Sequence, residues 1–185
     1  QPIGIYVSGK YAYVTNYSSS TISVVDVSNP SVPVQVATTS VGTNPKFINV
    51  SGRYAYTANE NTNTGLSVID ISNPAVPVQV AAIDVGVSPV SLHVSGRYAY
   101  IVDEGGSTLI VVDVSSSTAP VVLKTITGVS NAIAVYVSGR HAYVANSGPE
   151  AISVIDISGT EVTSLMAHSA EVGNLQSRND IFAQG

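Results

Sequence analysis

Histidine suits both acid–base catalysis near neutral pH and metal binding, and the chain contains three, His93, His141 and His168. None belongs to a His-x-x-x-His or Glu-x-x-His pattern, and the chain has no cysteine, so no zinc site is predicted. When the chain is aligned with itself, His93 and His141 occupy positions that hold tyrosine elsewhere. A catalytic or ligating side chain would not be exchangeable with tyrosine. We therefore expect both to have structural or surface roles.

Four aspartates that recur along the chain are the next candidates for chemistry. They are Asp26, Asp70, Asp113 and Asp156. Paired carboxylates that catalyse acid–base reactions occupy one place in a protein, whereas these occur once in every repeat. Each stands just before a predicted turn, where a carboxylate can accept hydrogen bonds from backbone N–H groups. Turn fixing is therefore the preferred interpretation of these residues.

No other motif for catalysis or cofactor binding is found. The serines form no Gly-x-Ser-x-Gly motif. Gly105 and Gly106 are not followed by the lysine and helix of a phosphate-binding loop. The sequence thus predicts no cofactor and no metal, and the chain is not expected to be an enzyme.

The elements that carry these residues follow from a repeated segment, V-S-G-R-Y-A-Y at residues 50–56. Close copies begin at Val7, Val94 and Val137, so successive copies are about 43 residues apart, a period typical of propellers and other repeat arrays. The central glycine can adopt a positive φ, and β-branched and aromatic residues flank it. Each copy therefore predicts a β-hairpin corner.

Each repeat divides into four strand-like runs, which in the first repeat are residues 3–7, 11–16, 21–27 and 34–40. The third run is apolar at nearly every position, as in a strand covered on both faces. Proline opens the fourth run, which indicates an outer edge strand. The sequence therefore predicts an all-β fold, a β-propeller-type array of four blades of four antiparallel strands.

The predicted repeat domain covers residues 1–166. Its blades span about residues 2–43, 44–87, 88–130 and 131–166. The fourth repeat lacks the fourth-strand sequence of the others, so completion of that blade and closure of the ring are both left open. Residues 167–185 follow no blade pattern and are interpreted as a tail, either a linker or oligomerisation stem or a disordered end.

Short motifs in the repeats resemble known families. Y-V-T-N at residues 13–16 resembles the YVTN surface-layer propeller repeat, and L-S-V-I-D-I-S at residues 66–72 is similar to the related LVIVD repeat. The resemblance implies a prokaryotic cell-surface or secreted propeller, or one from a virus of prokaryotes, in a group mostly without assigned activity. Asp103 departs from the pattern because it replaces the asparagine that ends the second run elsewhere.

Composition limits the classes of partner. The formal net charge of −5 argues against nucleic acid, whose binding needs clustered Lys and Arg. No run of 18 apolar residues is present, so no membrane span is predicted. The chain starts at Gln1 without methionine and is interpreted as a processed product or a fragment. Its abundance of Ser, Thr, Asn and Gly is common in exported proteins, so an extracellular or cell-surface location is expected.

The two rims of the predicted propeller differ in sequence. One rim carries a cation in each hairpin corner, expected to be solvated: Lys10, Arg53, Arg97 and Arg140. The opposite rim carries the loops between second and third runs, which vary most, and variable loops on a rigid scaffold often bind ligands. The candidate binding residues are Glu60, Asn61, Asp103, Glu104, Ser147 and Glu150. The alternative is loop variation without function, and no loop has the ligand density of a calcium site.

We therefore expect a non-enzymatic extracellular structural or interaction module, a cell-surface or fibre protein that mediates assembly or adhesion. Self-association into a homo-oligomer or fibre is predicted, because an incomplete fourth blade would leave a strand edge open for a sister chain. A surface glycan or protein is a further possible partner. The alternative is a carbohydrate-binding lectin or propeller enzyme that uses the variable rim.

Overall fold

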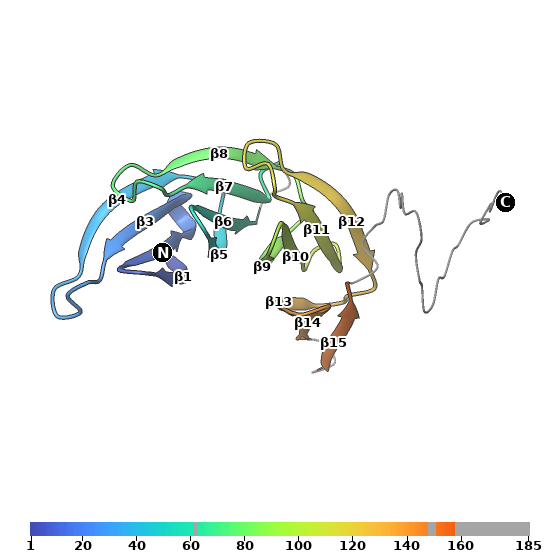
Figure 1. Ribbon diagram of the computed structural model, residues 1–185. Helices are drawn as coiled ribbons and strands as arrows, with labels where there is room; N and C mark the ends of the chain where they lie inside the picture. The colour runs from blue at the N-terminus through green and yellow to red at the C-terminus, as the bar shows by residue number, and fades with distance from the viewer. Residues whose placement is uncertain (61–62, 148–150, 158–185) are drawn as a thin grey trace, which may run out of the picture.

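The computed structural model describes residues 1–60, 63–147 and 151–157, and most of them lie in short β-strands. Four antiparallel sheets, the blades, follow one another along an arc (Figure 1). In three blades the strand order is the sequence order, and the described part of the fourth has three strands in that order. This confirms the predicted all-β, propeller-type array of antiparallel blades.

The elements follow the predicted runs closely. The first blade contains β1 (Pro2–Ser8), β2 (Tyr11–Asn16), a 3-10 turn η1 (Tyr17–Ser19), β3 (Thr21–Asp26) and β4 (Val34–Ser40). The second contains β5 (Pro45–Ser51), β6 (Tyr54–Asn59), β7 (Leu66–Asp70) and β8 (Val78–Ile83). The third contains β9 (Pro89–Ser95), β10 (Tyr98–Asp103), β11 (Thr108–Asp113) and β12 (Val121–Thr127). The fourth contains β13 (Ala132–Ser138), β14 (His141–Asn146) and β15 (Ala151–Asp156).

The hairpin corners have the predicted backbone. Gly9, Gly52, Gly96 and Gly139 all have φ between 57° and 59°. An added Cβ would meet no atom within 4 Å at any of them, so glycine is required by the left-handed backbone and not by crowding.

The core consists of layers between successive blades. The first strand of each blade lies nearest the axis of the arc, and β4, β8 and β12 form its outer side (Figure 1). A layer of buried apolar side chains fills each of the three junctions between neighbouring blades. The third strand of an inner blade is therefore covered on both faces, which explains its apolar sequence.

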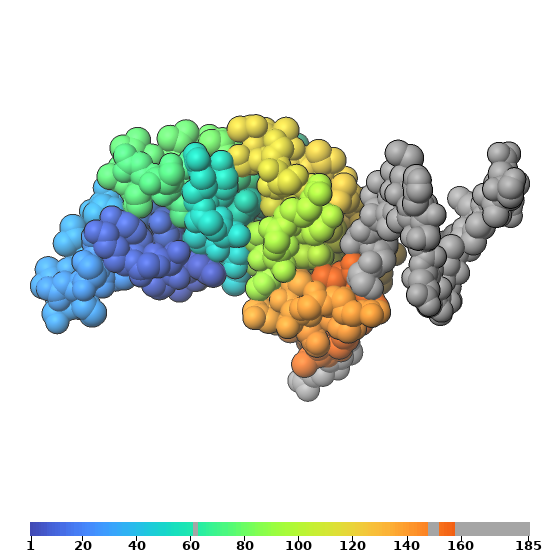
Figure 2. Space-filling view, viewed as in Figure 1, coloured from blue at the N-terminus to red at the C-terminus, as the bar shows by residue number. Residues whose placement is uncertain are grey.

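The arc is open. In Figure 2 the first blade (blue) and the fourth blade (orange) are separated, with the second and third blades between them. The predicted fourth strand of the last blade and the tail of residues 167–185 lie outside the described residues.

Candidate functional site

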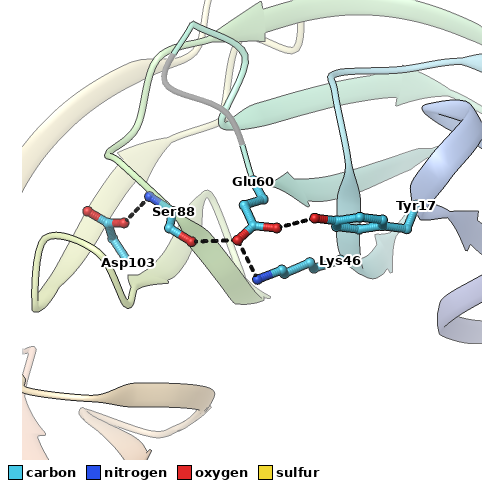
Figure 3. Close-up of polar contacts among 5 residues, drawn as sticks. All are labelled: Tyr17, Lys46, Glu60, Ser88 and Asp103. Carbon is cyan, nitrogen blue, oxygen red and sulfur yellow. Dashed lines mark hydrogen bonds and ion pairs between the residues drawn. The ribbon is translucent and has the colours of Figure 1, made fainter.

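The variable rim contains a polar network that joins three blades (Figure 3). The Glu60 carboxylate accepts a hydrogen bond of 2.5 Å from the Tyr17 hydroxyl and one of 3.3 Å from Ser88 Oγ. It also pairs with Lys46 Nζ at 2.9 Å. The hydrogen bond from Tyr17 and the contact with Lys46 lower the pKa of Glu60 from its ordinary value, so the carboxylate is charged at neutral pH.

Asp103 fixes the loop that enters the third blade. Its carboxylate accepts hydrogen bonds from the backbone N–H of Val87 (3.1 Å) and Ser88 (2.6 Å), and the residue is buried. Gly86 in this loop has φ 121°, and a Cβ there would lie 2.5 Å from Asp103 Oδ2. Glycine is thus needed at this position both for the backbone angle and for the close approach of the carboxylate.

The replacement of asparagine by Asp103 is coupled to a second replacement. In the other blades the asparagine side chain contacts a serine of the third strand, as Asn59 Nδ2 donates to Ser67 Oγ at 3.0 Å. The third blade has Ile110 at that serine position, beside Asp103. Asp103 therefore has no serine partner in its own blade, and its carboxylate binds the backbone of the loop that enters the blade.

The structure brings together some of the predicted binding residues. Ser88 contacts both Glu60 and Asp103, and the Glu104 backbone N–H donates to the Ser88 carbonyl at 3.1 Å. Ser147 belongs to a different contact, with its backbone N–H and Oγ donating to a carbonyl of the loop that enters the fourth blade. Asn61 and Glu150 lie outside the described residues. Glu60 and Asp103 thus join loops and blades, and ligand binding at this rim stays a prediction.

The opposite rim carries one ion pair per blade, a contact that was not predicted from the sequence. The pairs are Lys10–Asp26, Arg53–Asp70, Arg97–Asp113 and Arg140–Asp156. The repeat pattern contains a signal for these pairs. In each blade the cation comes directly before a residue of the second strand that pairs with the aspartate of the third strand. The cationic side chains are exposed as predicted, so each pair adds little stability.

Turn fixing by the aspartates is confirmed in the first three blades. Asp26, Asp70 and Asp113 each accept a hydrogen bond from the backbone N–H of the serine two residues later, at 2.8–2.9 Å. The arginine and these turn hydrogen bonds stabilise the charged carboxylates and lower the pKa of Asp70 and Asp113 to about 2.

The faces at the two ends of the arc differ from the faces inside it. At one position of the third strand Ile22, Leu66 and Leu109 are fully buried, whereas Ile152 of the last blade is 71% exposed. Two neighbouring side chains, Val154 and Tyr143, are 58% and 40% exposed, and their counterparts in the first three blades are buried. We call the surface of Tyr143, Ile152 and Val154 the exit face.

The first blade has the complementary exposed surface. Ile5 and Val7 of β1 are 64% and 57% exposed, and we call the surface that they form the entry face. In the second blade the same positions hold Ile48 and Val50, which pack against Tyr13, Ile22 and Val24 of the first blade. Every junction inside the arc therefore joins the exit positions of one blade to the entry positions of the next.

The comparisons with known proteins agree with this architecture. The model of the LVIVD repeat matches residues 3–40, 45–85, 89–127 and 130–167. A comparison with curated proteins finds no match. Within the described residues no helix is long and apolar enough to cross a membrane.

Three solved structures have a similar fold. The Pseudomonas aeruginosa periplasmic gluconolactonase PpgL has a TM-score of 0.75 at 19% identity, over 86% of this chain and 51% of that chain. A candidate 6-phosphogluconolactonase from Bacteroides uniformis has 0.73 at 17%, over 84% and 50%. The β-propeller domain of Cps50 (Swd1) from Myceliophteria thermophila has 0.65 at 7%, over 83% and 52%. The chain thus spans about half the length of each.

These structures correct one prediction. The chain was expected not to be an enzyme because no compact catalytic motif is present, but proteins named as lactonases share its propeller fold. At such low identity the likeness shows the fold alone. The missing motif is therefore no argument against activity, because a propeller can assemble a site from residues that are far apart in the sequence.

Proposed function

We propose that this chain, which belongs to the LVIVD repeat family, is an interaction module that completes a propeller ring with a second copy of itself. The exit face of one copy packs on the entry face of the other, so two junctions form in the complete ring. The observation that carries this proposal is the exposure of Ile152 and Val154, whose counterparts in the other three blades are fully buried.

The two end faces are chemically suited to each other because the chain already contains this contact three times. The exit positions hold tyrosine and branched aliphatic side chains, and the entry positions hold Ile, Leu or Val in all four blades. On the exit face a shallow hollow of about 240 Å³ lies among Tyr136, Tyr143 and Ile152. An aliphatic side chain from an entry face would fill such a hollow.

The energetic balance favours a closed ring over a single junction. Burial of each exposed aliphatic side chain contributes roughly 1.5–3 kcal/mol. Association of two chains costs roughly 4–15 kcal/mol in lost translational and rotational freedom. In a two-copy ring the second junction forms without repeating that cost. The resulting array of about eight blades is within the range of known propellers.

The three solved structures support this size. In each of them the matching part is about half of the chain, as expected if four blades make up half of a ring. We further propose that the module acts in assembly or adhesion outside the cytoplasm of a prokaryote. The Ser- and Thr-rich composition and the likeness to a periplasmic protein support this location.

Sedimentation of the full chain tests the proposal. We expect a species of twice the chain mass of 19.0 kDa at micromolar concentration. Ile152→Asp should give a monomer, because a charge on the exit face cannot be buried in the junction. Val76→Asp is the matched control, since Val76 is similarly exposed, at 62%, but lies in an outer turn. A wild-type chain that is monomeric at micromolar concentration would refute the two-copy ring.

A further inference from the structure

The inner side of the arc contains a cavity that none of the functions considered above uses. Its volume is about 340 Å³, and it is lined by residues of the four innermost strands β1, β5, β9 and β13. One repeat position supplies a lining side chain in every blade. These side chains are Tyr6, Asn49, His93 and Tyr136. Phe47 adds a further aromatic side chain.

The polar groups of this cavity have free hydrogen-bonding capacity. Asn49 is only 8% exposed, and its side-chain amide makes no hydrogen bond to any residue that the structure describes. Within the same residues the His93 imidazole makes none either, and its ring packs edge-on against Tyr136 with centroids 4.6 Å apart. The Asn49 amide is accessible from the cavity, so a ligand there can form the hydrogen bonds that the protein does not supply.

The imidazole is neutral under ordinary conditions. Burial lowers the pKa of His93 from its ordinary value, since the charged form is poorly solvated there. Neutral histidine offers one donor and one acceptor, the Asn49 amide offers both, and the tyrosine hydroxyls offer both. The cavity therefore presents a mixed set of neutral donors and acceptors beside aromatic rings.

The uncharged lining of the cavity indicates which class of ligand it can bind. Of the described residues that line the cavity, none is Lys, Arg, Asp or Glu, so neither a phosphate nor an ammonium group would find an opposite charge. A sugar ring matches the surface, because its hydroxyls pair with neutral donors and acceptors and its C–H face packs on aromatic rings. The volume is at the lower end of the range of ligand pockets, about 300–1,000 Å³, as suits a single ring.

We propose that this cavity binds a neutral sugar ring, with Asn49 and His93 hydrogen-bonded to its hydroxyls and with Phe47 and Tyr136 against its apolar face. The lining residues all belong to one copy of the chain, and Tyr136 also lines the hollow on the exit face. The sequence predicts a structural or surface role for His93, because its repeat position holds tyrosine in other blades. In the structure these unlike residues surround one cavity, so their variation gives the site its mixed donors and acceptors.

An NMR titration of the full chain tests the site. The probes are methyl α-D-glucoside, methyl α-D-mannoside and methyl β-D-galactoside, each at up to about 50 mM, with glucose 6-phosphate as the charged comparison. We expect at least one neutral glycoside to shift the backbone amide signals of Phe47, Asn49 and His93. We expect glucose 6-phosphate to bind at least tenfold more weakly.

Two variants identify the residues responsible. Asn49→Tyr introduces the residue of the first and fourth blades and should fill the cavity and weaken binding at least tenfold. His93→Tyr should also fill the cavity, with a side chain from the third blade, and weaken binding at least tenfold. It is the test variant if Asn49→Tyr does not fold. Asn29→Ala, in an exposed turn, is the control and should bind as the wild type does. Absence of shifts with all three glycosides, unchanged binding in both tyrosine variants, or equal binding of the phosphate would overturn the proposal.

Discussion

The junctions inside the arc and the faces at its ends are built from the same residue types, yet they differ completely in exposure. Leu109 of the third blade is fully buried against the fourth blade, whereas Ile152, one repeat later, is 71% exposed. Both residues pair with the second strand of their own blade, and Leu109 also pairs with Ile126 of β12. Burial in a repeat array is therefore decided by the neighbouring blade and not by the sequence of the blade itself.

The largest effect is expected when the same charge is placed inside and at the end of the array. Leu109→Asp would bury an unpaired carboxylate and should cost at least about 4 kcal/mol of unfolding free energy. Ile152→Asp should change the unfolding free energy by under about 0.5 kcal/mol, because that side chain is exposed. Urea unfolding of both variants, at concentrations where the wild type is monomeric, measures the difference. Equal losses would mean that the exit face is covered within the monomer.

The next prediction concerns the pairing of unlike faces. Ile5→Asp removes the entry face and Ile152→Asp removes the exit face, so each variant alone should be monomeric. A mixture still contains one intact face of each kind and should form a two-chain complex through a single junction, at least tenfold weaker than the wild-type ring. Sedimentation of the mixture and of each variant alone provides the measurement. Association of either variant by itself would show that like faces pair.

The sequence predicted the repeated parts of the fold well because they depend on local residues. Glycines at the hairpin corners, prolines before the outer strands and aspartates at the turns all act within one blade. Glu60 was identified as a candidate, but its contacts to Tyr17 and Ser88 join loops of different blades, and no local pattern encodes them. The exposed end faces could not be predicted either, since an alignment of the repeats treats all four blades as equal.

One buried hydroxyl group lies at a position that is apolar in the other three blades. Thr57 Oγ1 is buried and has no hydrogen-bond partner among the described residues, whereas the other blades have Val14, Ile101 and Val144 at this position. Thr57→Val keeps the shape and removes the unsatisfied group, so it should raise the unfolding free energy by about 1 kcal/mol. The reverse change, Val144→Thr in the last junction, should lower it by about 1–2 kcal/mol. Thermal and urea unfolding test both, and a destabilised Thr57→Val would indicate a partner for the hydroxyl.

The smallest effect is expected at the rim of ion pairs, which is the same in inner and end blades. The pKa of Asp70 and of Asp113 is about 2 in the folded chain, below the ordinary value of 3.8. A lowered pKa means that the charged carboxylate stabilises the fold. This contribution is fully present above about pH 4 and is lost as the pH falls through 2.

NMR titration of the side-chain carboxyl carbons measures these values directly. Arg53→Gln should raise the pKa of Asp70 towards 3.8, because the arginine is the largest cause of its shift, and should leave Asp113 near 2 as the internal control. The pKa of Asp70 should stay somewhat below 3.8 in this variant, since the Ser72 backbone N–H still donates to the carboxylate. An unchanged Asp70 would show that the exposed ion pair is absent in solution and that the turn hydrogen bond alone holds the carboxylate.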